Sequence, residues 1–300
     1  MNIITIGSFI EDNRFDLIIK YLETKEFKVV KLDNSQNYQD QGKFSLIIHK
    51  IKDNNPVKYA KIQDYSLINP ECIILDNVES ILLINNRISL SRCLKNLNFI
   101  FEDNVVCFPT SWIVDNNETS LDLVEFPAII KPSDDNNPET AHVMALVYNI
   151  KGFNEAHEKL GSNILAQKFI NHDGVLYKIY CIGESVNISL RPSLQNTFYD
   201  YSGSDCIFYG RVSKYEDPTL NLITKLPSLE FIRKLCGHIG NIFGINIFGI
   251  DLIKETNSNC YFVIDINHFP SFVGVSDVPE AFYDLIQTQL TLKSKQSFDP

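Results

Sequence analysis

Apolar and polar positions follow two different patterns along this chain of 300 residues. In the first hundred residues, short apolar runs typical of strands are followed by stretches with the apolar spacing of a helix. The predicted strands are residues 3–9, 27–32, 44–51 and 72–76, and the predicted helices are residues 14–24, 57–65 and 78–97. Strands that alternate with helices predict a small parallel sheet with helices outside it.

After about residue 105 the strand-like runs come in close pairs, which is typical of antiparallel hairpins. The predicted strands here are residues 126–131, 143–148, 164–170, 175–182, 185–191, 247–254 and 260–267, with helices at residues 229–243 and 280–293. The sequence therefore predicts a mixed α/β and α+β chain. We expect an N-terminal domain at residues 1–104, a central subdomain at 105–190 and a C-terminal subdomain at 191–300.

The composition excludes several classes of function. The net charge of -10 argues against a general nucleic-acid surface, so basic residues that meet an anionic ligand must be gathered in a pocket. No apolar stretch reaches the ~18 residues that span a bilayer, and the N-terminal residues predict a strand, not a signal peptide. The seven cysteines contain no CxxC pair, which favours a reducing compartment. We expect a cytoplasmic monomer with no nucleic-acid or membrane partner.

The run YFVIDINHFP at residues 261–270 places two polar residues in an apolar strand. Asp265 and Asn267 share one face because side chains alternate along a strand, and the same alternation predicts that residues 262, 264 and 266 face the other way. The run IFGIDLI at 247–253 and a turn at 255–259 predict a hairpin with Asp251 opposite residues 263–265. Two carboxylates and a carboxamide are hard oxygen ligands suited to Mg²⁺. The alternative is a solvated polar face.

A second hairpin predicts a basic face. A two-residue turn at Gly183–Glu184 places Lys178 opposite Ser189, with Arg191 on the same face. Two cations on one face suggest an anion such as phosphate, although a pair of surface charges is the alternative. Lys131 ends the apolar run FPAIIKP and either joins this site or is an exposed strand end. The sequence contains no GxxxxGK[ST], GxGxxG, HRD or DFG motif, so a nucleotide site here does not use those frameworks.

These segments together resemble a known family. QKFINHDGVLYKIYCIGES, RPSL, FGIDLI, VIDINHFPSFVGV and LIIHK are similar to segments of the inositol-tetrakisphosphate 1-kinase family, also named inositol 1,3,4-trisphosphate 5/6-kinases, within the ATP-grasp superfamily. The resemblance implies an ATP-grasp fold whose Rossmann-like N-terminal domain contributes to the inositol phosphate site. It implies a kinase that uses ATP and two Mg²⁺ ions. The implied reactions are phosphorylation of inositol 1,3,4-trisphosphate at the 5- or 6-hydroxyl and of inositol 3,4,5,6-tetrakisphosphate at the 1-hydroxyl, with reversible transfer between inositols.

The resemblance also implies roles for individual residues. The implied metal ligands are Asp251, Asp265 and Asn267, and the implied catalytic residues are Lys131, Lys178 and Asp265. The implied ATP contacts are Arg87, Lys131, Gln167, Lys168, Phe169, Ile170, Lys178, Ser193 and Ser213. The implied inositol phosphate contacts are Arg14, Lys50, His142, Lys178, Arg191, Asn267, Ser271 and Gly274.

The chain departs from the family pattern at two places. The loop DDNNPETA at residues 134–141 lacks the glycine that the family has there, and Ser271 replaces a common glycine. Two other functions stay open on the sequence. One is an ATP-grasp carboxylate–amine ligase, which gives no reason for the HK pair at residues 49–50. The other is a catalytically weak inositol phosphate sensor, which gives no reason for an intact Asp251, Asp265 and Asn267.

Overall fold

The computed structural model describes residues 4–10, 15–51, 55–114, 123–133, 143–161, 163–197, 203–210 and 225–296. Three predicted site residues, Arg14, His142 and Ser213, lie outside the described residues, as does the loop at 134–141. Within the described part of the chain, no helix is long and apolar enough to cross a membrane.

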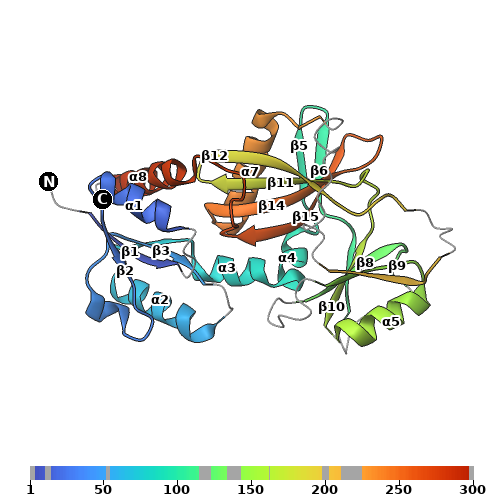
Figure 1. Ribbon diagram of the computed structural model, residues 1–300, viewed down its shortest axis with the longest axis horizontal. Helices are drawn as coiled ribbons and strands as arrows, with labels where there is room; N and C mark the ends of the chain where they lie inside the picture. Colours follow the sequence, from blue (N-terminus) through green and yellow to red (C-terminus); the bar gives the residue numbers. More distant parts are fainter. Residues whose placement is uncertain are drawn as a thin grey trace.

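The N-terminal part forms a four-stranded parallel sheet, as the alternation of strands and helices predicts. Its order is β2-β1-β3-β4. The elements are β1 (Thr5–Ile10), α1 (Asp16–Thr24), β2 (Lys28–Lys31), a 3-10 helix (Tyr38–Gln41), β3 (Leu46–Lys50), α2 (Pro56–Ile68) and β4 (Ile73–Leu75). The C-terminal helix α8 (Val278–Gln296) returns to this sheet and packs beside α1 (Figure 1).

The helix predicted at residues 78–97 is wrong in its length, because two helices occupy this stretch. They are α3 (Val78–Asn85) and α4 (Arg87–Leu94). Asn86 between them has the extended backbone angles φ -103 and ψ 110, and its side chain accepts a hydrogen bond from the Ser89 N–H at 2.9 Å. Asparagine favours this capping geometry over a helix interior. The break frees the backbone N–H of Arg87, which donates to the Ser133 carbonyl at 2.9 Å.

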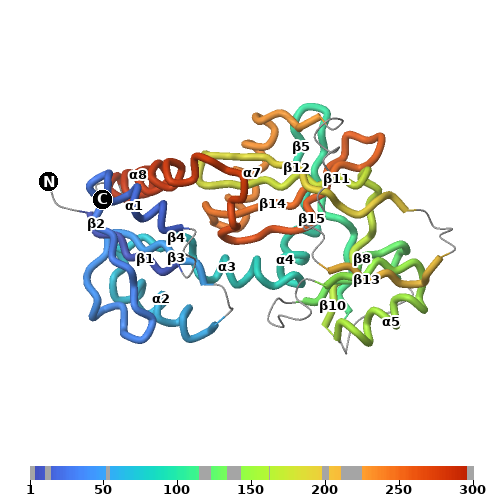
Figure 2. Tube along the Cα trace, in the orientation of Figure 1, coloured from blue at the N-terminus to red at the C-terminus, as the bar shows by residue number. Residues whose placement is uncertain are grey.

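Two further sheets follow, and Figure 2 shows the chain passing between them. The five-stranded antiparallel sheet has the order β13-β9-β8-β10-β7, and the six-stranded sheet has the order β12-β11-β14-β15-β6-β5 with only β6 and β15 parallel. The strands of the first are β7 (Ser111–Val114), β8 (Ala128–Pro132), β9 (Met144–Val147), β10 (Ile164–Lys168) and β13 (Cys206–Tyr209), with helix α5 (Ile150–Leu160) against them. The strands of the second are β5 (Asn98–Phe101), β6 (Asn104–Cys107), β11 (Val175–Ile182), β12 (Ser185–Pro192), β14 (Ile247–Lys254) and β15 (Cys260–His268). The sequence does not predict β5, β6, β7 or β13, each of four residues.

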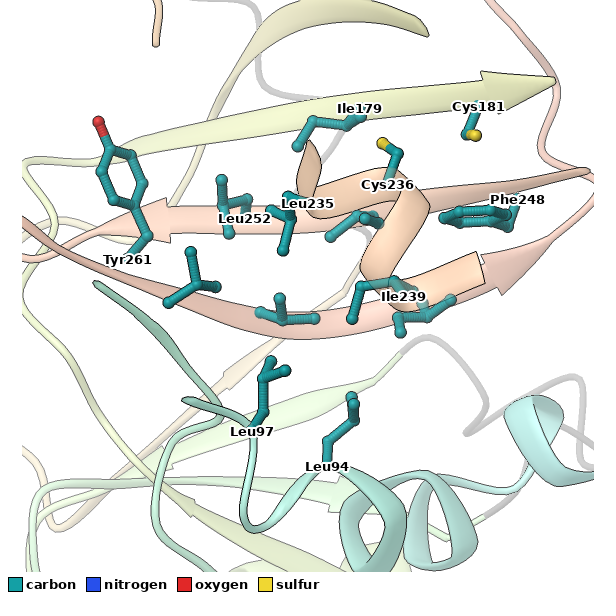
Figure 3. Close-up of a cluster of buried hydrophobic side chains, with 14 of the residues drawn as sticks. Leu94, Leu97, Ile179, Cys181, Leu235, Cys236, Ile239, Phe248, Leu252 and Tyr261 are labelled. Carbon is teal, nitrogen blue, oxygen red and sulfur yellow. The ribbon is translucent and has the colours of Figure 1, made fainter. Parts of the chain in front are cut away.

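One face of the six-stranded sheet is covered by α7 (Leu229–Phe243) and forms the main core (Figure 3). Leu235 and Ile239 of the helix pack over strand residues such as Ile179 and Leu252, all of them buried. Because side chains alternate along each strand, this packing leaves the other face of β11 and β14 for polar residues.

A β-bulge in β15 changes the predicted alternation. Asp251 pairs with Asp265 but its neighbour Leu252 pairs with Val263, so Ile264 is an extra residue. Val263 before the bulge and Ile266 after it both face the core, whereas a regular strand would place them on opposite faces. The prediction that residues 262, 264 and 266 share one face is therefore wrong. Asp265 and Asn267 still share a face, because both follow the bulge.

Asp76, directly after β4, joins the N-terminal sheet to the six-stranded sheet. Its buried carboxylate accepts three hydrogen bonds of 2.9 Å, from the backbone N–H and the side-chain amide of Asn246 and from the backbone N–H of Ile247. These bonds hold the first residue of β14. Burial raises the pKa of this carboxyl group, while the hydrogen bonds oppose the shift.

We expect Asp76→Asn to lower the free energy of unfolding by about 2–4 kcal/mol, because an amide turns a donor toward a buried N–H that has lost its acceptor. Urea unfolding at pH 7.5 measures the change. Asn246→Ala is the matched control, since it removes one of the three bonds and is expected to cost about 1 kcal/mol. Equal stability of Asp76→Asn and the wild type would contradict this account of the junction.

Candidate functional site

The polar face of β11, β14 and β15 carries an acidic pair beside a lysine. Asp251 lies opposite Asp265 on one side and opposite Lys178 on the other. The Nζ of Lys178 donates a short hydrogen bond to Oδ1 of Asp251, and both side chains are about four-fifths buried, with exposures of 18% and 20%. Asn267 donates a long hydrogen bond of 3.4 Å from Nδ2 to Oδ2 of Asp265. The structure thus brings together the three residues predicted as metal ligands.

The electrostatics of this cluster follow from burial and pairing. Burial raises the pKa of Asp251, and the neighbouring charge of Asp265 raises it further, while Lys178 lowers it. Burial alone would disfavour the ammonium of Lys178, but the attraction of Asp251 outweighs it and raises the pKa of Lys178. One lysine therefore offsets part of the repulsion between two carboxylates, and a further cation would be favoured there.

The donor chemistry of these three side chains fits Mg²⁺. All three offer oxygen, and Mg²⁺ is commonly bound through one or two carboxylates together with substrate phosphates. Among the residues that the structure describes, no group of three or more His, Cys, Asp or Glu side chains could hold a metal ion. A divalent ion between Asp251 and Asp265 therefore needs further oxygen ligands, and a nucleotide would supply them.

Lys131 reaches this cluster from the five-stranded sheet. Its Nζ donates to the Gln167 Oε1 at 3.0 Å and to the backbone carbonyl of Ile264, the bulge residue, at 3.1 Å. Burial lowers the pKa of Lys131 to about 8; the charge of Asp265 opposes this shift, and that of Arg87 adds to it. Arg87 itself donates from Nη1 to the Pro132 carbonyl at 2.9 Å. Lys131 therefore does not lie at an exposed strand end.

An apolar cluster lies on the Lys131 face of the five-stranded sheet. Ile129, two residues before Lys131, forms a buried cluster with Leu146 and Phe169. Partly buried side chains around it are Met144, Tyr148, Leu194 and Tyr209. Such an apolar surface next to buried cations suits a flat aromatic base that carries phosphates.

The segment at residues 167–170 contributes Phe169 to this cluster. The backbone N–H of Lys168 donates to the Thr110 carbonyl at 2.8 Å, and that of Phe169 donates to the Pro127 carbonyl at 3.0 Å. The side chain of Lys168 pairs with Glu125 at 2.7 Å on the surface, where such a pair contributes little. The charge of Lys168 is therefore paired with Glu125 at the surface.

The N-terminal domain places Lys50 near the end of β15. Its Nζ lies 4.5 Å from the ring centroid of Phe15 and 5.3 Å from that of Phe269, which are cation–π distances. Ser271 and Gly274 are exposed in the loop that follows, and an added Cβ at Gly274 would meet nothing within 4 Å. Arg191 lies on the Lys178 face of β12, one side chain beyond Ser189, as the predicted register requires.

Sequence reasoning missed several contributors to this site. The resemblance implies that Gln167 contacts ATP but not that its side chain holds Lys131, and the residue pattern marks it only as a polar residue in the apolar run ILAQKFI. The Ile264 carbonyl depends on the bulge, which leaves no mark in the residue pattern. His172 and Asp76 act through hydrogen bonds between distant segments, which local patterns do not show.

A cavity of about 1140 Å³ lies elsewhere, on the face of the six-stranded sheet that carries α7. Its lining includes Tyr177, Phe231 and Tyr261, which belong to the core under α7 and therefore point away from Asp251. It is therefore separate from the cluster of carboxylates and lysines.

Two family models match the chain. The inositol 1,3,4-trisphosphate 5/6-kinase ATP-grasp domain matches residues 101–288, and the pre-ATP-grasp domain of the same kinases matches residues 8–81. An inositol-tetrakisphosphate 1-kinase of Danio rerio is 29% identical over 91% of this chain and 73% of its own length. One of Xenopus laevis is 30% identical over 88% of this chain and 72% of its own length, and the 1-kinase 1 of Arabidopsis thaliana is 27% identical over 90% of each.

Solved structures show the same fold at low sequence identity. A D-alanine–D-alanine ligase from Bacillus anthracis superposes with a TM-score of 0.63 and 12% identity, over 98% of this chain and 99% of that one. A RimK domain ATP-grasp protein from Sphaerobacter thermophilus has a TM-score of 0.57 and 15% identity, over 94% and 99%. With both domain models matched in order, the chain belongs to the inositol 1,3,4-trisphosphate 5/6-kinase family and has the ATP-grasp fold.

Proposed function

We propose that this protein transfers the γ-phosphoryl group of ATP to a hydroxyl of an inositol polyphosphate with the help of Mg²⁺. Family membership makes it an ATP-dependent inositol polyphosphate kinase. One observation carries the proposed site. Lys178 and the Asp251–Asp265 pair share one face of the six-stranded sheet, and Lys131 reaches this face from the five-stranded sheet. The proposed substrates are inositol 1,3,4-trisphosphate, at the 5- or 6-hydroxyl, and inositol 3,4,5,6-tetrakisphosphate, at the 1-hydroxyl.

Phosphoryl transfer mostly requires alignment and neutralisation of charge. Adenine would lie against the apolar cluster around Phe169, with backbone groups of residues 167–170 along its edge. Lys131 and Lys178 would bind phosphate oxygens, exchanging their present partners for the nucleotide. Asp251, Asp265 and Asn267 would hold one or two Mg²⁺ ions, which supply further positive charge when bound.

The acceptor side is proposed to use basic groups from both ends of the chain. Lys50 and Arg191 would bind inositol phosphates, and Asn267, Ser271 and Gly274 would line the ring. Arg14 and His142 keep their predicted roles as inositol phosphate contacts, and Ser213 keeps its predicted role as an ATP contact. The position of Lys50 supports this arrangement. Its ammonium lies against the ring of Phe269, which directly follows β15, the strand that carries Asp265 and Asn267.

The division into residues 1–104, 105–190 and 191–300 stays a prediction. The sheets interleave these segments, since β11 pairs with β14 of the C-terminal segment and β13 pairs with β9 of the central one. A cytoplasmic location and a monomeric state also stay predictions from the sequence.

A direct test incubates the purified protein with ATP, Mg²⁺ and inositol 1,3,4-trisphosphate and separates the products by chromatography. The proposal expects inositol tetrakisphosphates and ADP in equal amounts. Turnover of ATP only when an amino acid is present would instead favour a ligase, and tight inositol phosphate binding without turnover would favour a sensor.

We expect Asp265→Ala to lower the rate of Mg²⁺-dependent ATP consumption by about 10²–10³-fold, because a charged group that positions the reacting phosphates is lost. The thermal unfolding midpoint should stay close to that of the wild type, since Asp265 lies on the polar face of β15 and not in the core. Asp284→Ala removes an exposed carboxylate of α8 and serves as the matched control with unchanged activity. Equal rates in Asp265→Ala and Asp284→Ala would remove Asp265 from the site.

The lowered pKa of Lys131 predicts a pH dependence of nucleotide binding. Its folded-state pKa of about 8 means that the free protein carries the ammonium below pH 8 and loses it above. We expect the affinity for ATP without metal to fall by about fivefold between pH 8 and 9. Calorimetric titration measures this, and Lys131→Arg, which stays charged, should abolish the decline. The same decline in Lys131→Arg would assign it to another group.

A further inference from the structure

Lys50 lies at the place in the N-terminal sheet where sheets of this kind bind ligands. The strand order β2-β1-β3-β4 means that the chain leaves β1 toward one side and returns on the other side with β3. In open parallel sheets, ligands bind beyond the carboxyl ends of the strands at such a reversal. Lys50 is the last residue of β3 and pairs with Ile10, the last residue of β1. The topology alone therefore places a cation where a ligand is expected.

Two aromatic rings, those of Phe15 and Phe269, lie against the ammonium of Lys50. Its Nζ is 4.5 Å from the ring centroid of Phe15 and 5.3 Å from that of Phe269, and aromatic rings attract a cation within about 6 Å. The two rings are perpendicular, with 5.0 Å between their centroids. Phe15 directly precedes α1 and Phe269 directly follows β15, so this aromatic pair joins the N-terminal domain to the strand that carries Asn267.

The backbone of Phe269 has a conformation that phenylalanine rarely adopts. Its φ of 44° lies in the left-handed region, which costs free energy for a bulky side chain. The surroundings hold it there, because its N–H donates to the Ile247 carbonyl at 3.0 Å and its ring packs 5.3 Å from that of Phe282 in α8. Strained residues of this kind occur mainly where a binding site needs them. The fold thus fixes the ring of Phe269, and the flexible side chain of Lys50 lies against it.

Packing of the core explains the two rings but not the position of the lysine. Phe15 and Phe269 both belong to the buried cluster between the N-terminal sheet, α1 and α8, with exposures of 3% and 1%. A lysine side chain loses the freedom of four rotatable bonds when its ammonium is held in one place. Contact with the two rings offsets this loss in the free protein. A phosphate that arrives then meets an ammonium that is already in position, which favours binding.

We propose that Phe15 and Phe269 are positioning residues that hold the ammonium of Lys50 for a phosphate of the inositol substrate. The inference rests on the proposed function and deepens it. An aromatic face attracts an ammonium without neutralising its charge, whereas the carboxylate of Asp251 neutralises that of Lys178. A phosphate can therefore bind the ammonium of Lys50 without displacing either ring.

The kinetic test measures KM for inositol 1,3,4-trisphosphate and KM for ATP in Phe15→Leu. We expect KM for the inositol phosphate to rise about threefold to tenfold, as for the loss of one cation–π contact, while KM for ATP stays unchanged. Phe15→Tyr, which keeps an aromatic face, should recover most of this loss. Phe27→Leu is the matched control, because it removes a different buried ring of the same cluster, 6.0 Å from that of Tyr283, and should leave both KM values unchanged.

A double substitution separates positioning from packing. Lys50→Met removes the ammonium and should itself raise KM for the inositol phosphate. Because Phe15 acts through Lys50 in this account, adding Phe15→Leu to Lys50→Met should produce no further rise. A further rise as large as the one that Phe15→Leu causes in the wild type would show that Phe15 acts by packing alone, and it would overturn the inference.

An NMR measurement tests the contact without turnover. In a ¹H–¹³C spectrum of protein labelled with ¹³C-lysine, the ε-methylene signal of Lys50, assigned with Lys50→Met, should be shifted upfield by the two rings. It should move toward the signals of the other lysines in Phe15→Leu. A wild-type signal of Lys50 among those of exposed lysines would overturn the inference.

Failure of the proposed function can be told apart from failure of this inference. A wild type that binds inositol 1,3,4-trisphosphate but phosphorylates no inositol would contradict the proposed function. Calorimetric binding of the same inositol phosphate would still decide the inference, because Phe15→Leu should bind it about threefold to tenfold more weakly than the wild type and Phe27→Leu should not. Equal affinities of the wild type and Phe15→Leu would overturn it.

Discussion

The functional face of the six-stranded sheet depends on one extra residue in β15. Before the bulge, Tyr261 and Val263 face α7, and strict alternation from there would send Asp265 and Asn267 into the same core. The bulge at Ile264 reverses the faces at the point where Asp265 meets Asp251. Its backbone carbonyl is then available to Lys131, which arrives from the other sheet. One irregularity thus places the acidic residues on the polar face of the sheet and connects the two sheets through Lys131.

The charges of the carboxylates and lysines in the proposed site are balanced in the protein without a ligand. Two carboxylates and two lysines lie close together, and each buried cation has an oxygen partner, Asp251 for Lys178 and Gln167 with Ile264 for Lys131. A nucleotide with its metal would exchange these partners one for one, since phosphates would replace the partners of the lysines and the metal would take the carboxylates. Such an exchange avoids leaving any buried charge alone, which is the costly state.

The sequence predicted the parts of this site that depend on local alternation. The pairing of Lys178 with Ser189 follows from strand period and turn length, and Asp251 pairs with a residue inside the predicted range 263–265. It did not predict the bulge, because an inserted residue changes which face the following side chains lie on but leaves no mark in the residue pattern VIDIN at 263–267. The break at Asn86 and the bonds of Asp76 and His172 also escaped, since each depends on a partner distant in sequence or on capping that competes with helix propensity. Resemblance to a family supplied the roles of exposed residues such as Ser271 and Gly274, which carry no pattern of their own.

The central claim is that Asp251, Asp265 and Asn267 hold a divalent ion on the phosphates of ATP, facing Lys131 and Lys178. A crystal structure with Mn²⁺ and a non-hydrolysable ATP analogue tests it most directly, because Mn²⁺ is located by its anomalous scattering. The account predicts an anomalous peak in contact with Asp265 and the nucleotide phosphates, with both lysines on phosphate oxygens. Phosphates bound elsewhere, or carboxylates without an ion at saturating Mn²⁺, would contradict it.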